Sequence, residues 1–149
     1  MNVRKVALFV EGFAELVFVR EFLLKWYEWD SAKVGFNCYT LHAGEQCDES
    51  YSWGDHDSEN YFQILNTGND NKVLSAMLDR ADGFHDAGYT LVVGLRDMFS
   101  QDRDEIINRV TRHVSENAGY GRIEKRNCTV VSYGSIMEKM FKKKNLKKN

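Results

Sequence analysis

The sequence predicts a single α/β domain in which helices flank a mainly parallel sheet. Short apolar runs alternate with longer segments of helical periodicity, which is the pattern of such layered folds. With 149 residues, 43% of them hydrophobic, the chain has the size and apolar content of one domain with a real core. We expect this domain to span residues 1–141 and a lysine-rich tail to follow at 142–149.

The first predicted strand is the apolar run at residues 6–10, which ends at Glu11. Gly12 is expected to make the turn into a helix whose first turn contains Glu15. Residues 13–29 are apolar nearly all round, apart from a narrow polar stripe of charged residues. This pattern predicts a mostly buried helix.

The middle of the chain predicts two strands, a loop and a helix. Residues 34–42 alternate loosely, as in a strand near a sheet edge. Residues 43–60 are acidic and contain no lysine or arginine, and we interpret them as an acidic loop. A short strand at 61–66 is followed by turn and N-cap residues, after which apolar side chains recur at helical spacing up to Gly88.

The second half begins with a continuous apolar run at 89–95, typical of a parallel strand covered on both faces. It ends at Arg96 and Asp97. A further helix, a strand at 129–133 and a short helical segment at 136–141 are predicted beyond it. Ligands of such sheets bind outside the carboxyl ends of the strands, where Glu11, Asp97 and residues 134–138 are expected.

Composition excludes several classes of protein. The formal net charge of −2 does not indicate a generally basic nucleic-acid binder. Three cysteines without a C-x-x-C pair fit a reducing, cytoplasmic setting. No apolar stretch approaches the roughly 20 residues of a membrane span. The glycine-rich dinucleotide and nucleotide-triphosphate fingerprints are also absent.

The acidic residues at the predicted strand ends suggest a site for a hard divalent cation such as Mg²⁺, because hard cations prefer oxygen ligands. Glu11, Glu15, Asp97 and Glu138 are the candidate ligands. Asp102, with the neighbouring acids at 104 and 105, falls in a predicted first helical turn, where the helix dipole favours negative charge. Asp102 is therefore open to two interpretations, metal ligand or helix cap.

Three motifs together resemble TOPRIM domains, specifically the branch similar to OLD nucleases and its small uncharacterised relatives. They are Val10-Glu11-Gly12-x-x-Glu15, the strand end Gly94-Leu95-Arg96-Asp97, and Glu138 within Ile-Met-Glu-x-Met-Phe. The resemblance implies a Rossmann-like fold with a mainly parallel sheet of about four strands flanked by helices. It also implies Mg²⁺ or Mn²⁺ binding and phosphoryl transfer on nucleic acid. Glu11 and Asp97 would be the catalytic residues. Phe99 stands where the family has the second acid of Asp-x-Asp.

Lys72 and Arg96 are the candidates for binding substrate phosphate. Arg96 is equally well interpreted as an ion-pair partner of Asp97. The lysines of residues 142–149 fit either a phosphate-binding tail or a solvated terminus.

Three functions are compatible with the sequence. The first is a metal-dependent nuclease or related phosphotransfer enzyme in bacterial or phage defence or DNA processing. The second is a non-catalytic module that binds metal, nucleic acid or a partner protein, which Phe99 favours. The third is a small phosphoesterase acting on nucleotides. The resemblance also suggests a partner ATPase, and the aromatic first helix is compatible with a homodimer.

Overall fold

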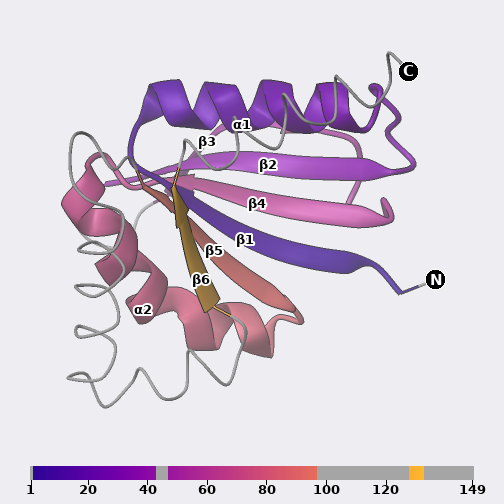
Figure 1. Cartoon of the computed structure of the whole chain (residues 1–149). Coiled ribbons are helices and arrows are strands. Elements are labelled where there is room, and N and C mark those ends of the chain that lie inside the picture. Colours follow the sequence, from indigo (N-terminus) through magenta and orange to yellow (C-terminus); the bar gives the residue numbers. More distant parts are fainter. Residues whose placement is uncertain (1, 43–46, 97–127, 133–149) are drawn as a thin grey trace.

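A mixed, mostly parallel sheet forms the centre of the fold, and the two helices of the described residues lie on opposite faces of it (Figure 1). The computed structural model describes residues 2–42, 47–96 and 128–132. Its elements in chain order are β1 (Arg4–Val10), α1 (Phe13–Trp26), β2 (Val34–Leu41), β3 (Cys47–Trp53), β4 (Asn60–Asn66), α2 (Asp70–Asp86), β5 (Leu91–Arg96) and β6 (Cys128–Ser132).

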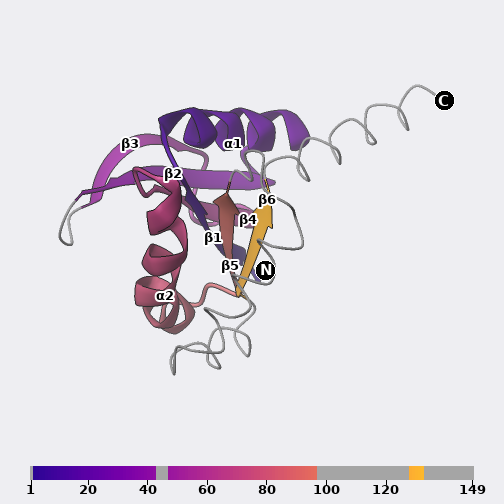
Figure 2. The ribbon, with the colours of Figure 1, turned by 60° about the vertical axis from the view of Figure 1, so that its left-hand side comes forward.

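The strands lie in the order β3-β2-β4-β1-β5-β6. Among the strands that the structure describes, only the pairing of β2 with β3 is antiparallel. Figure 2 shows β6 alongside β5, at the end of the sheet away from β3. The predicted α/β class with a mainly parallel sheet is therefore confirmed, although the sheet has more strands than the four expected.

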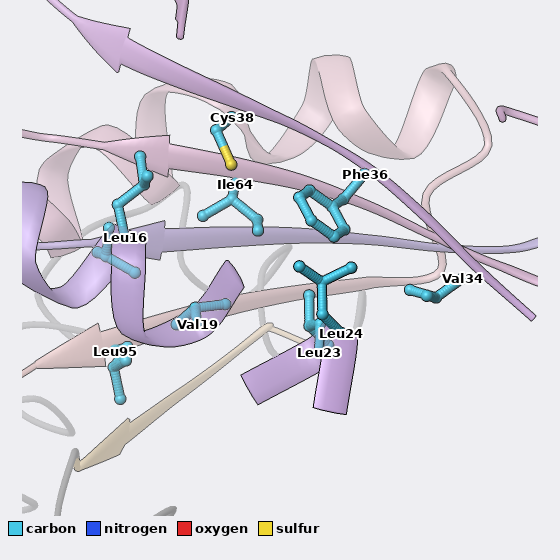
Figure 3. Close-up of a cluster of buried hydrophobic side chains, with 10 residues drawn as sticks. Leu16, Val19, Leu23, Leu24, Val34, Phe36, Cys38, Ile64 and Leu95 are labelled. Atoms are coloured by element: carbon cyan, nitrogen blue, oxygen red, sulfur yellow. The ribbon is translucent and has the colours of Figure 1, made fainter. Parts of the chain in front are cut away.

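Two hydrophobic cores form, one on each face of the sheet. On the α1 face, Leu16, Leu23 and Leu24 of the helix pack toward Phe36 and Ile64 of the strands (Figure 3). Complete burial of each such side chain is worth about 1.5–3 kcal/mol. The apolar stripe of α1 therefore holds that helix against β2 and β4.

On the α2 face, Phe9 of β1 packs against the helix residues Val73, Met77 and Phe84. The rings of Phe9 and Phe84 meet edge to face, with their centroids 5.8 Å apart. Because both faces of β1 contribute to a core, its residues from Val6 to Val10 are all apolar.

Helix α2 begins and ends close to the predicted bounds. The side chain of its N-cap residue, Asn69, accepts a hydrogen bond of 3.1 Å from the backbone N–H of Lys72. The predicted capping role of this turn is confirmed. No helix in the described ranges is long and apolar enough to cross a membrane.

The prediction of a loop throughout residues 43–60 is wrong, because β3 occupies Cys47–Trp53. Its apolar face consists of Tyr51 and Trp53, which pack against the core on the α1 face. The acidic residues around these two aromatic residues obscured the alternation of apolar and polar residues that is typical of a strand. The pairing with β3 makes β2 the second strand of the sheet, next to the edge strand β3, which agrees with the prediction of a strand near a sheet edge.

Helix α1 ends three residues earlier than predicted, at Trp26. Glu28 and Trp29 adopt left-handed backbone conformations, with φ of 56° and 58°. The Trp29 N–H donates to the Leu24 carbonyl oxygen at 2.8 Å, which closes the last turn. Trp26 and Trp29 are 40% and 51% exposed, so neither ring belongs to the core.

Two glycine substitutions test the packing of this fold. A Cβ at Gly35 would collide with the Asp55 carbonyl oxygen and approach the Ser58 hydroxyl to 2.8 Å. We expect Gly35→Ala to lower the free energy of unfolding by about 1–3 kcal/mol, since backbone would have to move. Gly83 lies inside α2 with open space at the Cβ position, so Gly83→Ala is expected to raise that free energy by about 0.5–1 kcal/mol.

Urea denaturation of both variants measures these changes. Equal effects of the two substitutions, or a stabilising Gly35→Ala, would contradict the packing around β2.

Candidate functional site

The carboxyl ends of β1, β4 and β5 meet at one edge of the sheet. Val10 of β1 is in register with Asn66 of β4, so Glu11 and Thr67 follow at neighbouring positions. The register of β1 with β5 pairs Phe9 with Gly94. Continued by two residues, this register puts Arg96 level with Glu11. The candidate site is built at this edge.

Glu11 is the buried acid of the site, with only 7% of its surface exposed. It lies where β1 has ended and α1 has not yet begun. Burial of a charged carboxylate is costly unless hydrogen bonds or positive charge compensate for it. A buried acid at a strand end is therefore a candidate for a functional role.

Glu15 brings a second carboxylate to the same turn. Its Oε2 lies 3.1 Å from where a Cβ on Gly12 would stand, so the side chain folds back over the N-cap residue of α1. The dipole of the helix favours a negative charge there. Gly12 has extended backbone torsions, with φ of −156°, which any residue adopts. Because Gly12 has no Cβ, it leaves room for the side chain of Glu15.

The start of the β4–α2 connection is fastened to the end of β1. The carbonyl oxygen of Val10 accepts a hydrogen bond from the backbone N–H of Thr67 and another from its hydroxyl, both at 2.9 Å. Asn66 accepts a hydrogen bond of 3.0 Å from the Gly68 N–H. Asn66 and Thr67 are both buried. These contacts fix the backbone immediately before Glu11.

Asn66 and Thr67 did not stand out in the sequence as parts of this site. The segment Asn-Thr-Gly-Asn indicated a turn and a helix cap, and both are local roles. The contact between Thr67 and Val10 joins residues 57 positions apart. This contact depends on β1 and β4 being neighbours in the sheet, which the sequence does not indicate.

The predicted site residues divide into three groups. Glu11, Glu15 and Arg96 lie at the carboxyl edge of the sheet, where Arg96 is half-buried. Lys72 is exposed in the first turn of α2. Asp97, Asp102 and Glu138 lie outside the described residues, and so does Phe99. In residues 2–42, 47–96 and 128–132, no group of three or more His, Cys, Asp or Glu side chains is arranged to hold a metal ion. A complete metal site therefore stays a prediction.

A second polar cluster lies on the α2 face and was not predicted. The Tyr61 hydroxyl donates to Asn37 at 2.7 Å, and the Asn37 amide donates to Glu49 at 3.0 Å. Nearby, the Tyr89 hydroxyl donates to Gln63 at 2.8 Å. The members come from β2, β3 and β4 and from Tyr89, two residues before β5, so only the strand register brings them together.

The two tyrosines of this cluster remain protonated at neutral pH. Burial raises the pKa of Tyr89 to about 12, with a smaller contribution from Tyr39. Burial also raises the pKa of Tyr61, and the neighbouring Tyr89 and Tyr39 add to this effect. Neither phenol is suited to act as a general base near pH 7. We interpret the cluster as structural.

Cys38 is buried in the core on the α1 face and forms no disulfide. Burial raises the pKa of its thiol to about 12. Because the thiolate is the nucleophilic form, Cys38 is unsuited to catalysis.

Comparison of the chain with models of known protein families, with curated proteins and with solved structures finds no match.

The hydrogen bonds of Thr67 lead to a stability prediction. Thr67→Val removes a buried hydroxyl that donates to Val10, and we expect a loss of about 1 kcal/mol in the free energy of unfolding. Thr90→Val removes a similar hydroxyl, 3.2 Å from the Lys5 carbonyl oxygen, at an exposed position. That control should change stability by less than about 0.5 kcal/mol. Chemical denaturation measures the free energy of unfolding of both variants. A loss for Thr90→Val as large as that for Thr67→Val, or larger, would contradict the contribution assigned to the Thr67 hydroxyl.

The raised pKa of Tyr89 predicts a dependence of stability on alkaline pH. The folded-state pKa lies above the ordinary value near 10, so the unfolded chain releases this proton first. The stability that protonated Tyr89 contributes to the folded state is fully present below about pH 10 and is lost as pH rises toward 12. We expect Tyr89→Phe to be less stable than the wild type at pH 8 but to lose stability less steeply between pH 10 and 11.5. Urea titrations across this range measure the slopes, and parallel slopes would contradict the assignment.

Proposed function

We propose that this protein is a divalent-metal-dependent phosphoryl-transfer enzyme acting on nucleic acid, in the simplest case a nuclease. The observation that carries the proposal is the burial of Glu11, 7% exposed, at the carboxyl end of a central parallel strand. Glu15 lies one turn further along the chain. The motifs shared with TOPRIM domains add Asp97 as the second catalytic residue.

The donor set fits Mg²⁺ or Mn²⁺. Both cations prefer carboxylate oxygens, and Glu11 and Glu15 supply such oxygens from positions four residues apart. Asp97 follows directly after β5 in the sequence, while Glu138 and Asp102 are additional candidates. A bound cation would polarise the scissile phosphate and help to generate hydroxide.

Two basic side chains would bind the phosphate groups of the substrate. Arg96 ends β5 level with Glu11, a position from which a guanidinium can bind a phosphate oxygen beside the acids. Lys72 in the first turn of α2 would contact the nucleic-acid backbone further out. The second interpretation of Arg96, as an ion-pair partner of Asp97, would hold that carboxylate in its charged form.

A second candidate is a non-catalytic module that binds metal, nucleic acid or a partner protein. Phe99 favours it, because phenylalanine stands where the resemblance places a carboxylate. A role in phage defence or DNA processing, a cytoplasmic location and a partner ATPase rest on the resemblance and belong to the same proposal.

A matched pair of glutamine variants tests the function. Glu11→Gln keeps the shape of the side chain and removes its charge. Glu59→Gln makes the same change at an exposed residue just before β4, at the opposite edge of the sheet. We expect Mn²⁺ to raise the melting temperature of the wild type and of Glu59→Gln, whereas Glu11→Gln loses most of this shift because a ligand charge is missing.

The same proteins are then incubated with supercoiled plasmid and with single-stranded DNA in Mg²⁺ or Mn²⁺. Cleavage by Glu11→Gln should fall by about 100-fold or more relative to Glu59→Gln. Stabilisation by metal without cleavage in the wild type would favour the non-catalytic module. If metal neither stabilises nor activates the wild type, the proposed site is wrong.

A further inference from the structure

Strand β3 lies at one edge of the sheet (Figure 2). Among the strands that the structure describes, its single neighbour is β2, with which it pairs antiparallel. An edge strand presents backbone N–H and C=O groups on its outer side, and these groups can pair with a strand of another chain. Glu49, Ser50 and Ser52 are exposed, so β3 is open to solvent.

Aromatic contacts on the α1 face hold β3 in a fixed position. The ring of Tyr51 stacks on Phe36 with centroids 5.9 Å apart, and the guanidinium of Arg20 lies over it at 4.6 Å. The ring of Trp53 meets that of Trp29 edge to face at 5.5 Å. A strand that is ordered before binding loses little conformational entropy when it pairs. The outer edge of β3 is therefore preorganised for an extended ligand.

Negative charge predominates around β3. No lysine or arginine occurs at residues 34–71. The exposed acidic residues that the structure describes in β3 and in its connection to β4 are Glu49, Asp55, Asp57 and Glu59. Two cations near this region are paired with other acids, Arg20 with Glu21 at 3.4 Å and Lys33 with Asp30 at 3.7 Å. This edge of the sheet therefore favours a ligand of positive charge and repels a phosphate backbone.

A bulge and the acidic residues oppose pairing of β3 with a second copy of itself. The register pairs Cys38 with Tyr51 and Tyr39 with Glu49, so Ser50 is an additional residue on β3. Such a bulge twists an edge strand and interrupts a long flat ladder. A second copy would also bring the same acidic residues to the interface. A short basic segment avoids both obstacles, because it can pair with the regular part of β3 next to the bulge.

We propose that the outer edge of β3 binds an extended, basic segment of a partner protein, which adds a strand to the sheet. Backbone hydrogen bonds to residues 51–53 hold the segment, and its lysine or arginine side chains lie near the acidic residues of β3 and of its connection to β4. Backbone pairing and opposite charge together supply the affinity of this short contact. The interaction is independent of the function proposed for Glu11, because it uses a different edge of the sheet.

Titration of the full chain with a short peptide tests the proposal. The probe is the peptide Lys-Val-Lys-Val-Lys-Val-Lys, which is basic and has β-branched residues that favour a strand. Amide NMR spectra of the ¹⁵N-labelled protein locate the binding surface, and hydrogen exchange measures the protection of each amide. We expect the peptide to shift the amide signals of residues 49–53 and to slow hydrogen exchange there, while the amides of α2 stay unchanged.

Two control peptides separate strand addition from simple attraction between charges. They have N-methyl groups on all valines or on all lysines, which removes the hydrogen-bond donors along one edge of the peptide strand and leaves its charge unchanged. We expect at least one of them to bind about tenfold more weakly than the parent peptide. Equal affinity of all three peptides would overturn the proposal, because charge alone would then explain the binding.

Matched charge reversals in the protein test the acidic edge. Glu49→Lys places a positive charge on β3, and Asp79→Lys makes the same reversal at an exposed position of α2. We expect Glu49→Lys to weaken binding of the parent peptide by about fivefold or more, and Asp79→Lys to bind nearly as the wild type does. Glu49→Gln keeps an oxygen that can accept the 3.0 Å hydrogen bond from Asn37, and it is expected to weaken binding through the loss of charge alone.

The absence of binding at millimolar peptide would overturn the proposal. Amide shifts confined to other parts of the chain, or equal effects of the two charge reversals, would also contradict a basic ligand at β3. If hydrogen exchange at residues 49–53 slows with rising protein concentration in the absence of peptide, a second copy occupies this edge and the proposal is wrong.

Discussion

The parallel pairing of β1 with β4 on one side and β5 on the other is the interaction on which the rest of the structure depends. Ala7, Phe9 and Val10 are inaccessible to solvent, because β1 is covered by strands at both edges and contributes side chains to the cores on both faces. A strand held in this way has no freedom to slide, since a shift of one residue would turn its apolar side chains to the wrong face. The point where β1 ends, and with it the position of Glu11, is therefore fixed by the core.

The same arrangement positions the two carboxylates at the carboxyl edge of the sheet. Thr67 binds the Val10 carbonyl oxygen through its backbone N–H and its hydroxyl, so the chain enters the turn before Glu11 in one defined way. Glu15 folds back over Gly12, which gathers negative charge at the N-terminal end of α1. Two nearby carboxylates repel each other unless a cation or a shared proton relieves them. A divalent metal with Arg96 beside it is the solution that our proposal adopts.

Much of the fold was predictable because its signals are local. The strands β1, β4 and β5 are dense apolar runs, and α2 combines an asparagine cap with helical spacing. Strand β3 escaped prediction because its acids masked the two aromatic residues that face the core. The hydrogen bonds of Thr67 to Val10 and of Tyr61 to Asn37 join positions far apart in the sequence, so no local pattern could indicate them. The strand pattern also predicted that Glu11, Glu15 and Arg96 lie at the carboxyl edge of the sheet, where the structure has them. Their role as a site stays a prediction, and Asp97 lies outside the described ranges.

The central claim is that the Glu11 carboxylate binds a divalent cation at the carboxyl edge of the sheet. The most direct measurement is the anomalous diffraction of a crystal of the protein grown with Mn²⁺, collected near the manganese absorption edge. Our account predicts an anomalous peak within about 2–2.5 Å of a Glu11 carboxylate oxygen, with Glu15 or Asp97 as a further ligand. A manganese ion bound elsewhere, with the Glu11 carboxylate engaged only by protein groups, would contradict it.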